Sequence, residues 1–177
     1  MPAFTIRPAT PADIPAITEI YAIEVREKTA TFELTAPDSA EMTRRFSEIA
    51  GQGFPYLVAE QGGEIAGYAY AASYRARPAY RFTVENSIYL APKHHRQGIG
   101  SALLSELIAQ SQARGFRQMI AVIGDSANAA SIALHARAGF DMIGTLPNVG
   151  FKFGRWLDSV LMQRALGEGS NTPAFPE

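Results

Sequence analysis

The stretch of residues 90–104 constrains the possible folds more than any other part of the chain. A strand pattern ends at Leu90, basic side chains follow, and Gly98 and Gly100 then open an amphipathic helix. The first amide groups of a helix have no partner within the helix and carry a partial positive charge. Because glycines let such a backbone approach a phosphate closely, this stretch predicts a pyrophosphate site at the helix start. The alternative is a plain turn in front of a helix.

Two common nucleotide-binding motifs are excluded at this position. A P-loop needs four residues between its glycines and then Gly-Lys-Ser/Thr, which the sequence lacks. The dinucleotide motif G-x-G-x-x-G needs three glycines, and Gly98-Ile-Gly100-Ser-Ala-Leu supplies only two. Lys93 and Arg96 precede the glycines and are expected to add positive charge at the rim of the site.

The rest of the chain alternates between strand and helix patterns. The predicted elements are, in order, strand 4–8, helix 10–25, helix 37–51, a hairpin of strands 56–60 and 64–71, strand 82–90, helix 98–114, strand 119–123, helix 128–138, and strands 140–144 and 151–166. This order predicts an α/β (α+β) layout in which helices cover a mixed sheet. We expect one domain over residues 1–166 and a disordered or loosely draped tail over 167–177.

Composition narrows the classes of function and partner. The net charge is −1, from 16 basic and 17 acidic side chains, and lacks the basic excess of a nucleic-acid-binding protein. The chain has no cysteine, and its three histidines, His94, His95 and His135, are poorly spaced for a metal site, so we expect no metal. We find neither a signal peptide nor an apolar run long enough for a membrane span, which favours a cytoplasmic protein without a membrane partner.

Arginines gather just before strand 82–90. Arg75 and Arg77 stand two apart with Arg81 close by, and no acidic residue lies between Glu64 and Glu85 to neutralise them. Local positive charge on a nearly neutral chain favours a small anionic ligand, and the planar guanidinium suits carboxylates and phosphinates. The alternative is a solvated loop.

Two segments resemble the acetyl-CoA motifs of the GNAT superfamily of N-acetyltransferases. His95-Arg-Gln-Gly-Ile-Gly100 resembles Gln/Arg-x-x-Gly-x-Gly/Ala, with His95 in the place of Gln or Arg, and residues 128–140 resemble Asn-x-x-Ser/Ala…Gly-Phe. The resemblance covers Phe4 to Leu166 and implies a mixed, mostly antiparallel sheet with acetyl-CoA as co-substrate. The cofactor contacts that it implies are Ile88, Tyr89, Leu90, Arg96, Gln97, Gly98, Ile99, Gly100, Ser101 and Asn128. Asn128 could bind the cofactor arm, cap its helix, or do both.

Within this superfamily, residues 82–92 and 150–158 look like the phosphinothricin N-acetyltransferase branch. Its members acetylate phosphinothricin, and relatives prefer methionine sulfoximine or methionine sulfone, so the resemblance implies a small anionic amino-acid-like acceptor. The herbicide-resistance enzymes commonly have Trp-His-Asp where this chain has Trp156-Leu157-Asp158, a departure that bears on the choice among these acceptors. The resemblance also implies a homodimer in which partner residues complete the acceptor pocket.

The predicted general base is Glu85. Side chains alternate along a strand, so Glu85 faces away from the apolar Val84 and Ile88, and a carboxylate in mid-strand is costly unless it is hydrogen-bonded or functional. His135 stands where many relatives carry a Tyr that protonates the leaving thiolate, and it is a candidate acid, second base or structural residue. The predicted acceptor site comprises Arg75, Ala76, Arg77, Glu85, Asn86, Ser87 and Phe32. Phe32 and Trp156 are candidates for the wall of this pocket, and the alternative for each is packing in the core.

Two other functions fit parts of this pattern. The same chemistry could act on another amine, such as a polyamine, an aminoglycoside or a protein N-terminus, but a cationic acceptor would favour an acidic pocket over one lined by Arg75 and Arg77. A non-catalytic acyl-CoA-binding module is the other alternative, and Glu85 argues against it because a binder needs no base.

Overall fold

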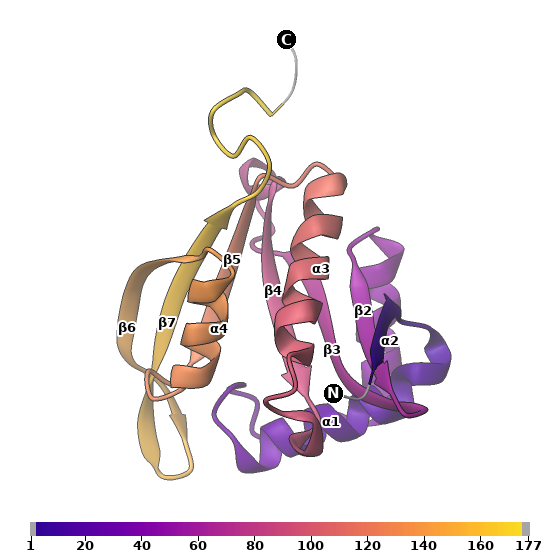
Figure 1. Ribbon diagram of the computed structural model, residues 1–177. Helices are drawn as coiled ribbons and strands as arrows, with labels where there is room; N and C mark the ends of the chain where they lie inside the picture. Colours follow the sequence, from indigo (N-terminus) through magenta and orange to yellow (C-terminus); the bar gives the residue numbers. More distant parts are fainter. Residues whose placement is uncertain (1–2, 175–177) are drawn as a thin grey trace.

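The computed structural model describes residues 3–174 as one mixed sheet with helices on both faces (Figure 1). The strands are β1 (Phe4–Pro8), β2 (Tyr56–Gln61), β3 (Glu64–Ser73), β4 (Thr83–Leu90), β5 (Gln118–Gly124), β6 (Asp141–Lys152) and β7 (Arg155–Ala165). The helices are α1 (Ile14–Glu27), α2 (Ser39–Gly51), α3 (Ile99–Ala113) and α4 (Ala129–Arg137), with short 3-10 turns η1 (Pro11–Asp13), η2 (Pro78–Tyr80) and η3 (Pro92–His94). This order confirms the predicted fold class and the predicted succession of helices and strands.

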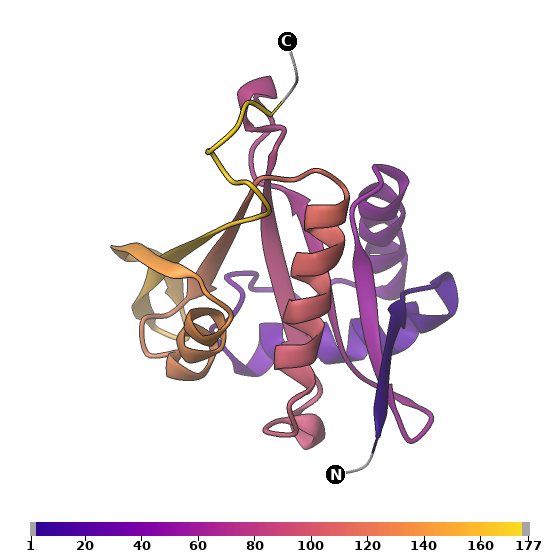
Figure 2. The ribbon, with the colours of Figure 1, turned by 45° about the horizontal axis from the view of Figure 1, so that its top comes forward.

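The seven strands lie in the order β1-β2-β3-β4-β5-β7-β6. All neighbouring pairs are antiparallel except β4 and β5, which run parallel because α3 crosses over between them. Helices α3 and α4 cover one face of the sheet, and α1 and α2 cover the other (Figures 1 and 2).

Local signals explain where the first two helices begin. The amide of Thr10 donates to the Asp13 carboxylate at 2.8 Å, which completes a capping box ahead of α1. The amide of Glu41 donates to the Asp38 side chain at 2.9 Å, so Asp38 caps α2. Both sequence predictions of these helix starts are confirmed.

Two apolar clusters fill the space on the two faces of the sheet. One gathers the stripe of α3, including Leu103, Leu104 and Leu107, against the sheet, and these three side chains are fully buried. The other packs Ile17 and Val25 of α1 with residues of α2 and a group of tyrosines on β2 and β3. Strand β4 is therefore covered on both faces, which leaves its edge as the place where a site can open.

The pairing of β4 with β5 stops before either strand ends. Register pairs join Thr83 to Gln118 and continue only to Asn86 and Ala121, although β4 runs to Leu90 and β5 to Gly124. Figure 1 shows the two strands together at the top of the view and apart at the bottom. The far halves of both strands thus face each other across a gap without sharing a ladder.

The prediction for the last two strands was wrong in its boundaries. Strands were expected over 140–144 and 151–166, with residues 145–150 between them, but β6 continues through that stretch and the turn falls at Phe153–Gly154. Strand β6 lies at the edge of the sheet, where a proline loses no ladder bond, and its register shifts twice against β7, between Met142 and Gly144 and between Leu146 and Gly150.

The chain continues beyond β7 into a short turn segment. Leu166 is buried, and the Arg117 guanidinium donates to the Gly169 carbonyl at 2.8 Å and to the Thr172 carbonyl at 3.0 Å. These bonds hold residues 167–172 against the start of β5. They lie within the tail predicted over 167–177, of which residues 175–177 are outside the described part. Across residues 3–174, no helix combines the length and apolar character needed to cross a membrane.

Candidate active site

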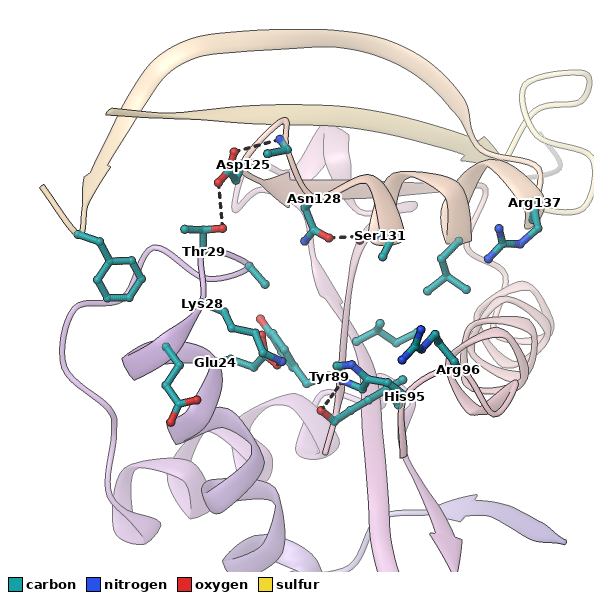
Figure 3. A pocket seen from close by; sticks show the side chains of 18 of the residues that line it. Glu24, Lys28, Thr29, Tyr89, His95, Arg96, Asp125, Asn128, Ser131 and Arg137 are labelled. Carbon is teal, nitrogen blue, oxygen red and sulfur yellow. Dashed lines mark hydrogen bonds and ion pairs between the residues drawn. The ribbon is translucent and has the colours of Figure 1, made fainter. Parts of the chain in front are cut away.

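A cavity of about 750 Å³ opens where β4 and β5 separate. Its walls come from the end of α1 and the following loop, the free end of β4, the loop before α3, the start of α4 and the β6–β7 turn (Figure 3). A second cavity of about 50 Å³ lies deeper in the gap and shares Ala30, Ile88, Tyr89, Asn128 and Ser131 with the first. Together they form one cleft that runs between the two halves of the sheet.

The start of α3 is shaped by left-handed backbone. Gly98 has φ 84°, where a side chain would be strained, and Arg96 has φ 59° although it is not a glycine. The hydrogen bonds of the helix begin with the Ala102 amide donating to the Gly98 carbonyl at 3.0 Å, and Gly98 offers no capping side chain. The amide groups ahead of Ala102 are therefore left for another partner.

The second glycine of this motif has a packing role. A Cβ at Gly100 would lie 3.3 Å from Leu90 Cδ1 and 3.7 Å from Leu134 Cδ2, so glycine lets α3 begin close to the end of β4 and to α4. A Cβ at Gly98 would meet nothing within 4 Å. The two glycines thus serve different purposes, one conformational and one steric.

The predicted cofactor contacts divide into two groups. Ile88, Tyr89, Leu90, Arg96 and Asn128 line the large cavity. The stretch Gln97, Gly98, Ile99, Gly100 and Ser101 follows Arg96 just outside the lining.

Several side chains of the loop before α3 are held by partners outside the cleft. Gln97 accepts from Gln61 at 3.2 Å and donates to the Lys93 carbonyl at 3.1 Å, so its side chain holds the loop. The ammonium of Lys93 pairs with Glu64, so the charge expected at the rim comes from Arg96.

Asn128 caps α4 at the edge of the cleft. Its side-chain oxygen accepts from the Ser131 amide at 3.2 Å, as the capping alternative predicted. The residue also lines both cavities, so capping leaves it within reach of a ligand.

Glu85 is half-buried on the face of β4 that packs toward α1 and α2, beside Ala72 of β3 and Ile120 of β5. Burial raises the pKa of its carboxyl group, and the positive charge of Arg75 acts in the opposite direction. The carboxylate lies outside the lining of both cavities, one residue before Asn86 in the smaller one. A base at this position would meet the cleft from the α1–α2 side.

His135 lies on the opposite face of β4 and is 3% exposed. Its Nε2 is 3.0 Å from Oδ1 of Asn86, and its Nδ1 is 2.8 Å from the carbonyl oxygen of Ser131. Because both partners are oxygens, only the doubly protonated ring donates to both, whereas burial lowers the pKa of the imidazole. The ring lines the smaller cavity. Its two acceptors favour the protonated imidazole, and its burial favours the neutral one.

The loop with Arg75, Ala76 and Arg77 is exposed between β3 and η2. The guanidinium of Arg75 lies 5.0 Å from the centre of the Tyr74 ring and acts electrostatically on Glu85. Arg77 precedes η2 as its N-cap residue. The structure therefore brings Arg75 close to the predicted base and leaves Arg77 in solvent.

The two aromatic residues proposed for the pocket wall lie apart from the core. Phe32, 36% exposed, packs its ring where a side chain at Gly150 would otherwise stand. Trp156, 61% exposed, contacts Phe151 across the β6–β7 hairpin, so the alternative of core packing is wrong for Trp156. Neither side chain lines the large cavity.

Many residues that line the large cavity were not predicted from the sequence, among them Glu24, Lys28 and Arg137. Glu24 and Lys28 of the α1 end form an ion pair at 2.7 Å within the cavity wall, and Arg137 of α4 faces the same end of the cavity as Arg96 (Figure 3). The one available signal was spacing: Glu24 and Lys28 stand four apart on a helix, the separation that brings side chains together. Nothing local in the sequence relates Arg137 to Arg96.

In the part of the chain that is described, no group of three or more His, Asp and Glu side chains is placed so that it could hold a metal ion.

Comparison with known proteins identifies relatives of this arrangement. The family model for the acetyltransferase (GNAT) domain matches residues 6–161. A phosphinothricin N-acetyltransferase of Alcaligenes faecalis is 53% identical over 96% of this chain and 86% of its own length. An L-methionine sulfoximine/L-methionine sulfone acetyltransferase of Pseudomonas aeruginosa is 42% identical over 96% of this chain and 98% of its own length.

Two solved structures carry acetyl-CoA on the same fold. A phosphinothricin acetyltransferase of Sinorhizobium meliloti in complex with acetyl-CoA superposes with a TM-score of 0.93 at 54% identity, covering 96% of this chain and 92% of the other. A structure from Salmonella typhimurium with its cofactor acetyl-CoA gives a TM-score of 0.93 at 40% identity, covering 98% and 99% of the two chains.

Proposed function

Because this chain belongs to the GNAT family of acetyltransferases, we propose that it acetylates the α-amino group of a small anionic amino acid of the phosphinothricin, methionine sulfoximine or methionine sulfone type. The chain is an acetyl-CoA-dependent N-acetyltransferase, and acetyl-CoA supplies the acetyl group as a thioester. The acceptor class rests on the relatives and on one observation in this chain: the positive charge of Arg75 acts on Glu85, which lies one residue before the β4–β5 pairing stops at Asn86.

The residues of the cleft suit a coenzyme A molecule. Arg96 and Arg137 provide positive charge at the end of the cavity next to the α3 start, where phosphates would find free amides as well. The edge of β4 from Ile88 to Leu90 pairs with β3 on one side but lacks a β5 partner on the other, and it borders the cavity. Backbone groups on that open side can accept from and donate to an extended amide-bearing arm. A volume of about 750 Å³ leaves room for such an arm.

Glu85 acts as the general base in this proposal. An amino acid's ammonium group must lose a proton before nitrogen can attack the thioester carbon, and a carboxylate with a raised pKa is better matched to that task. The carboxylate lies outside the two cavities, so it receives the proton through a water molecule or from an amine seated on the α1–α2 side.

His135 supplies the proton that the leaving thiolate takes up. It lies across β4 from Glu85, and Asn86 and Ser131 favour the protonated form of its ring. Acid and base on opposite faces of one strand would let protons enter and leave from different sides of the reacting carbonyl.

Arg75 and Arg77 bind the acceptor's anionic groups in this proposal, together with Ala76, Asn86, Ser87 and Phe32 as the remaining surface of the acceptor site. The positive loop favours an anionic acceptor over a polyamine or an aminoglycoside, because a second cation beside the arginines would be repelled. Since the charge of Arg75 also lowers the pKa of Glu85, the same arginine would link acceptor binding to the protonation state of the proposed base.

A panel assay of CoA release tests the acceptor class. Methionine sulfone, methionine sulfoximine and phosphinothricin are compared with methionine, spermidine and an aminoglycoside at one acetyl-CoA concentration. We expect kcat/KM for the first three to exceed that for spermidine by at least about 100-fold, the discrimination that roughly 3 kcal/mol supports. Faster turnover of spermidine or the aminoglycoside would overturn the anionic acceptor while leaving the transferase reaction intact.

We also propose a homodimer that uses the β6–β7 hairpin. This hairpin exposes a set of large apolar side chains, each about half-exposed or more: Met142, Ile143, Leu146, Val149, Phe151, Phe153 and Trp156. Several exposed large apolar side chains on one hairpin favour a protein–protein contact. Light scattering at assay concentration should give twice the chain mass of 19.2 kDa, and particles of 19.2 kDa alone would refute the dimer.

A further inference from the structure

The loop between α1 and α2, residues 28–34, crosses the open end of the cleft; we call it the clasp loop. The two halves of the sheet are joined by β4–β5 pairing at one end only, because that pairing stops at Asn86 and Ala121. Figure 1 shows the clasp loop, in purple, reaching from α1 toward the β6–β7 hairpin at the other end. It is thus a second connection between the halves, made by side chains, by two backbone carbonyls of the loop and by glycines that leave room for the contacts.

Lys152 of β6 makes the central contact. Its side chain is almost fully buried, and its Nζ donates to the carbonyl oxygens of Lys28 and Thr31, both at 2.8 Å. Burial lowers the pKa of this amine, while the charges of Glu24 and Glu33 act to raise it. A buried ammonium needs such partners, so the two carbonyls are held where the amine lies.

Two further contacts fix the same loop. The Thr29 hydroxyl donates to the buried Asp125 carboxylate at 3.1 Å. The Phe32 ring occupies the space of two absent side chains: a Cβ on Gly150 would lie 2.5 Å from the ring, and a Cβ on Gly124 would lie 3.0 Å from it. The loop is therefore anchored to β5 and to β6 independently of Lys152.

The anchored loop stands where the two cavities meet. Lys28, Thr29 and Ala30 line the large cavity, and Ala30 also lines the small one with Asn86, Ser87 and His135. We propose that Lys152 is a positioning residue, which fastens the clasp loop and thereby sets the width of the cleft at the point of acetyl transfer. This inference rests on the proposed transferase function. The amine itself contacts backbone carbonyls and acts through the loop.

The test replaces Lys152 with Met, which keeps the length of the side chain and removes the donor. Arg114→Met is the matched control, because Arg114 is a cation that also donates to backbone carbonyls, of Gly53 and of Gln110, both at 3.0 Å, and it lies at the far end of α3. Hydrogen exchange of residues 28–34, the Kd for acetyl-CoA and steady-state kinetics with methionine sulfone are measured for both variants.

For Lys152→Met we expect amide exchange in the clasp loop to rise by about tenfold or more. We expect kcat to fall by roughly 10- to 100-fold, since misplacement by about 1 Å can cost that much. The Kd for acetyl-CoA should change by less than about threefold, because the α3 start is untouched. Arg114→Met should leave loop exchange and kcat within about twofold of the wild type.

Faster loop exchange with unchanged kcat would overturn the proposal, since the clasp would then hold the loop without serving transfer. If Lys152→Met fails to fold, Lys152→Gln decides instead: its shorter amide side chain cannot bond both carbonyls as the ammonium does, and kcat should fall by about three- to tenfold. An unchanged kcat in that variant would refute the positioning role. A wild-type protein that acetylates no amine would refute the proposed function, and the exchange data would still report whether Lys152 holds the loop.

Discussion

The two faces of β4 differ in what packs on them and, in our proposal, in what they do. Glu85, Ser87 and Tyr89 point toward α1 and α2, where Tyr89 meets Tyr21 edge-on with ring centres 5.1 Å apart. Val84, Ile88 and Leu90 point toward α3 and the cluster that it forms with the sheet. One strand thus separates a face rich in hydroxyl and carboxyl groups from a largely apolar face.

The difference shows how one strand can serve a reaction between two substrates. Strand β4 stays paired with β3 along nearly its whole length, from Gly67 opposite Leu90 to Ser73 opposite Val84, so its position is fixed. On its other edge, β4 has no β5 partner beyond Asn86, so the backbone groups there are open to a ligand between the two faces. An acceptor on one side and a cofactor on the other would then meet at that edge. Variants on each face should change different kinetic constants.

The largest effect is expected for Glu85→Gln, which removes the proposed base and keeps the shape of the side chain. Turnover should fall by about 10²–10⁴-fold, the range for general acid–base catalysis, while the Kd for acetyl-CoA stays near its wild-type value. Stopped-flow turnover and calorimetric binding measure the two constants. A loss of less than about threefold at every pH would exclude Glu85 as the base.

The next effect concerns acceptor binding on the same side of β4. Arg75→Ala and Arg77→Ala should each lower kcat/KM by about 10- to 150-fold, since a charge-assisted hydrogen bond contributes roughly 1.5–3 kcal/mol. Much of the loss should fall in KM for the amino acid. Phosphinothricin carries a charged side group and methionine sulfone a neutral one, so the double variant should affect phosphinothricin more. Equal losses would place the arginines on the shared α-carboxylate, and no loss would mean a solvated loop.

On the opposite face, Gly100→Val should weaken the cofactor and spare the acceptor. The Cβ would lie 3.3 Å from Leu90 Cδ1, and the two further methyl groups would push the start of α3 away from β4. The Kd for acetyl-CoA should rise about tenfold or more, equivalent to about 1.4 kcal/mol. Gly51→Val is the control, because a Cβ at Gly51 in α2 meets nothing within 4 Å. Unchanged affinity with an intact fold would argue against a cofactor site at the start of α3.

Much of this layout was predictable because it depends on neighbours in the sequence. The glycines before α3, the cap at Asn128 and the alternation that isolates Glu85 are all local patterns. The boundaries of β6 were not predictable, since only its place at the sheet edge makes Pro147 acceptable.

The contacts across the cleft were also beyond sequence patterns. Lys152 meets Lys28 across 124 positions of the chain, and Phe32 fits against Gly124 and Gly150 only once the sheet has formed. Arg137 likewise approaches the end of the cavity occupied by Arg96 only through the packing of α4. These residues have unremarkable local surroundings, and three-dimensional assembly alone gives them a place in the site.

The smallest expected effect is a shift in the pH dependence of kcat/KM, which would show that Arg75 acts on the proposed base Glu85. Burial raises the pKa of Glu85, and the positive charge of Arg75 lowers it. In the proposed mechanism, transfer needs the carboxylate of Glu85, so the acidic limb of log kcat/KM against pH should report its pKa in the free enzyme. Removing the charge in Arg75→Ala takes away the lowering influence, and the limb should move to higher pH. The shift should shrink at high salt, because Arg75 is exposed and its field is screened.

Arg77→Ala is the matched control for this shift, since it removes the same charge two residues away, at the N-cap of η2. It should lower kcat/KM for the acceptor and leave the acidic limb in place. Rates are measured from pH 5 to 9 at low and high salt, with methionine sulfone so that the side group of the acceptor carries no charge. A shift of equal size in both variants would mean a diffuse effect of net charge. A limb that stays in place in Arg75→Ala, or moves to lower pH, would mean that the group titrating in the rate is not Glu85 or that Arg75 does not act on it in the working enzyme.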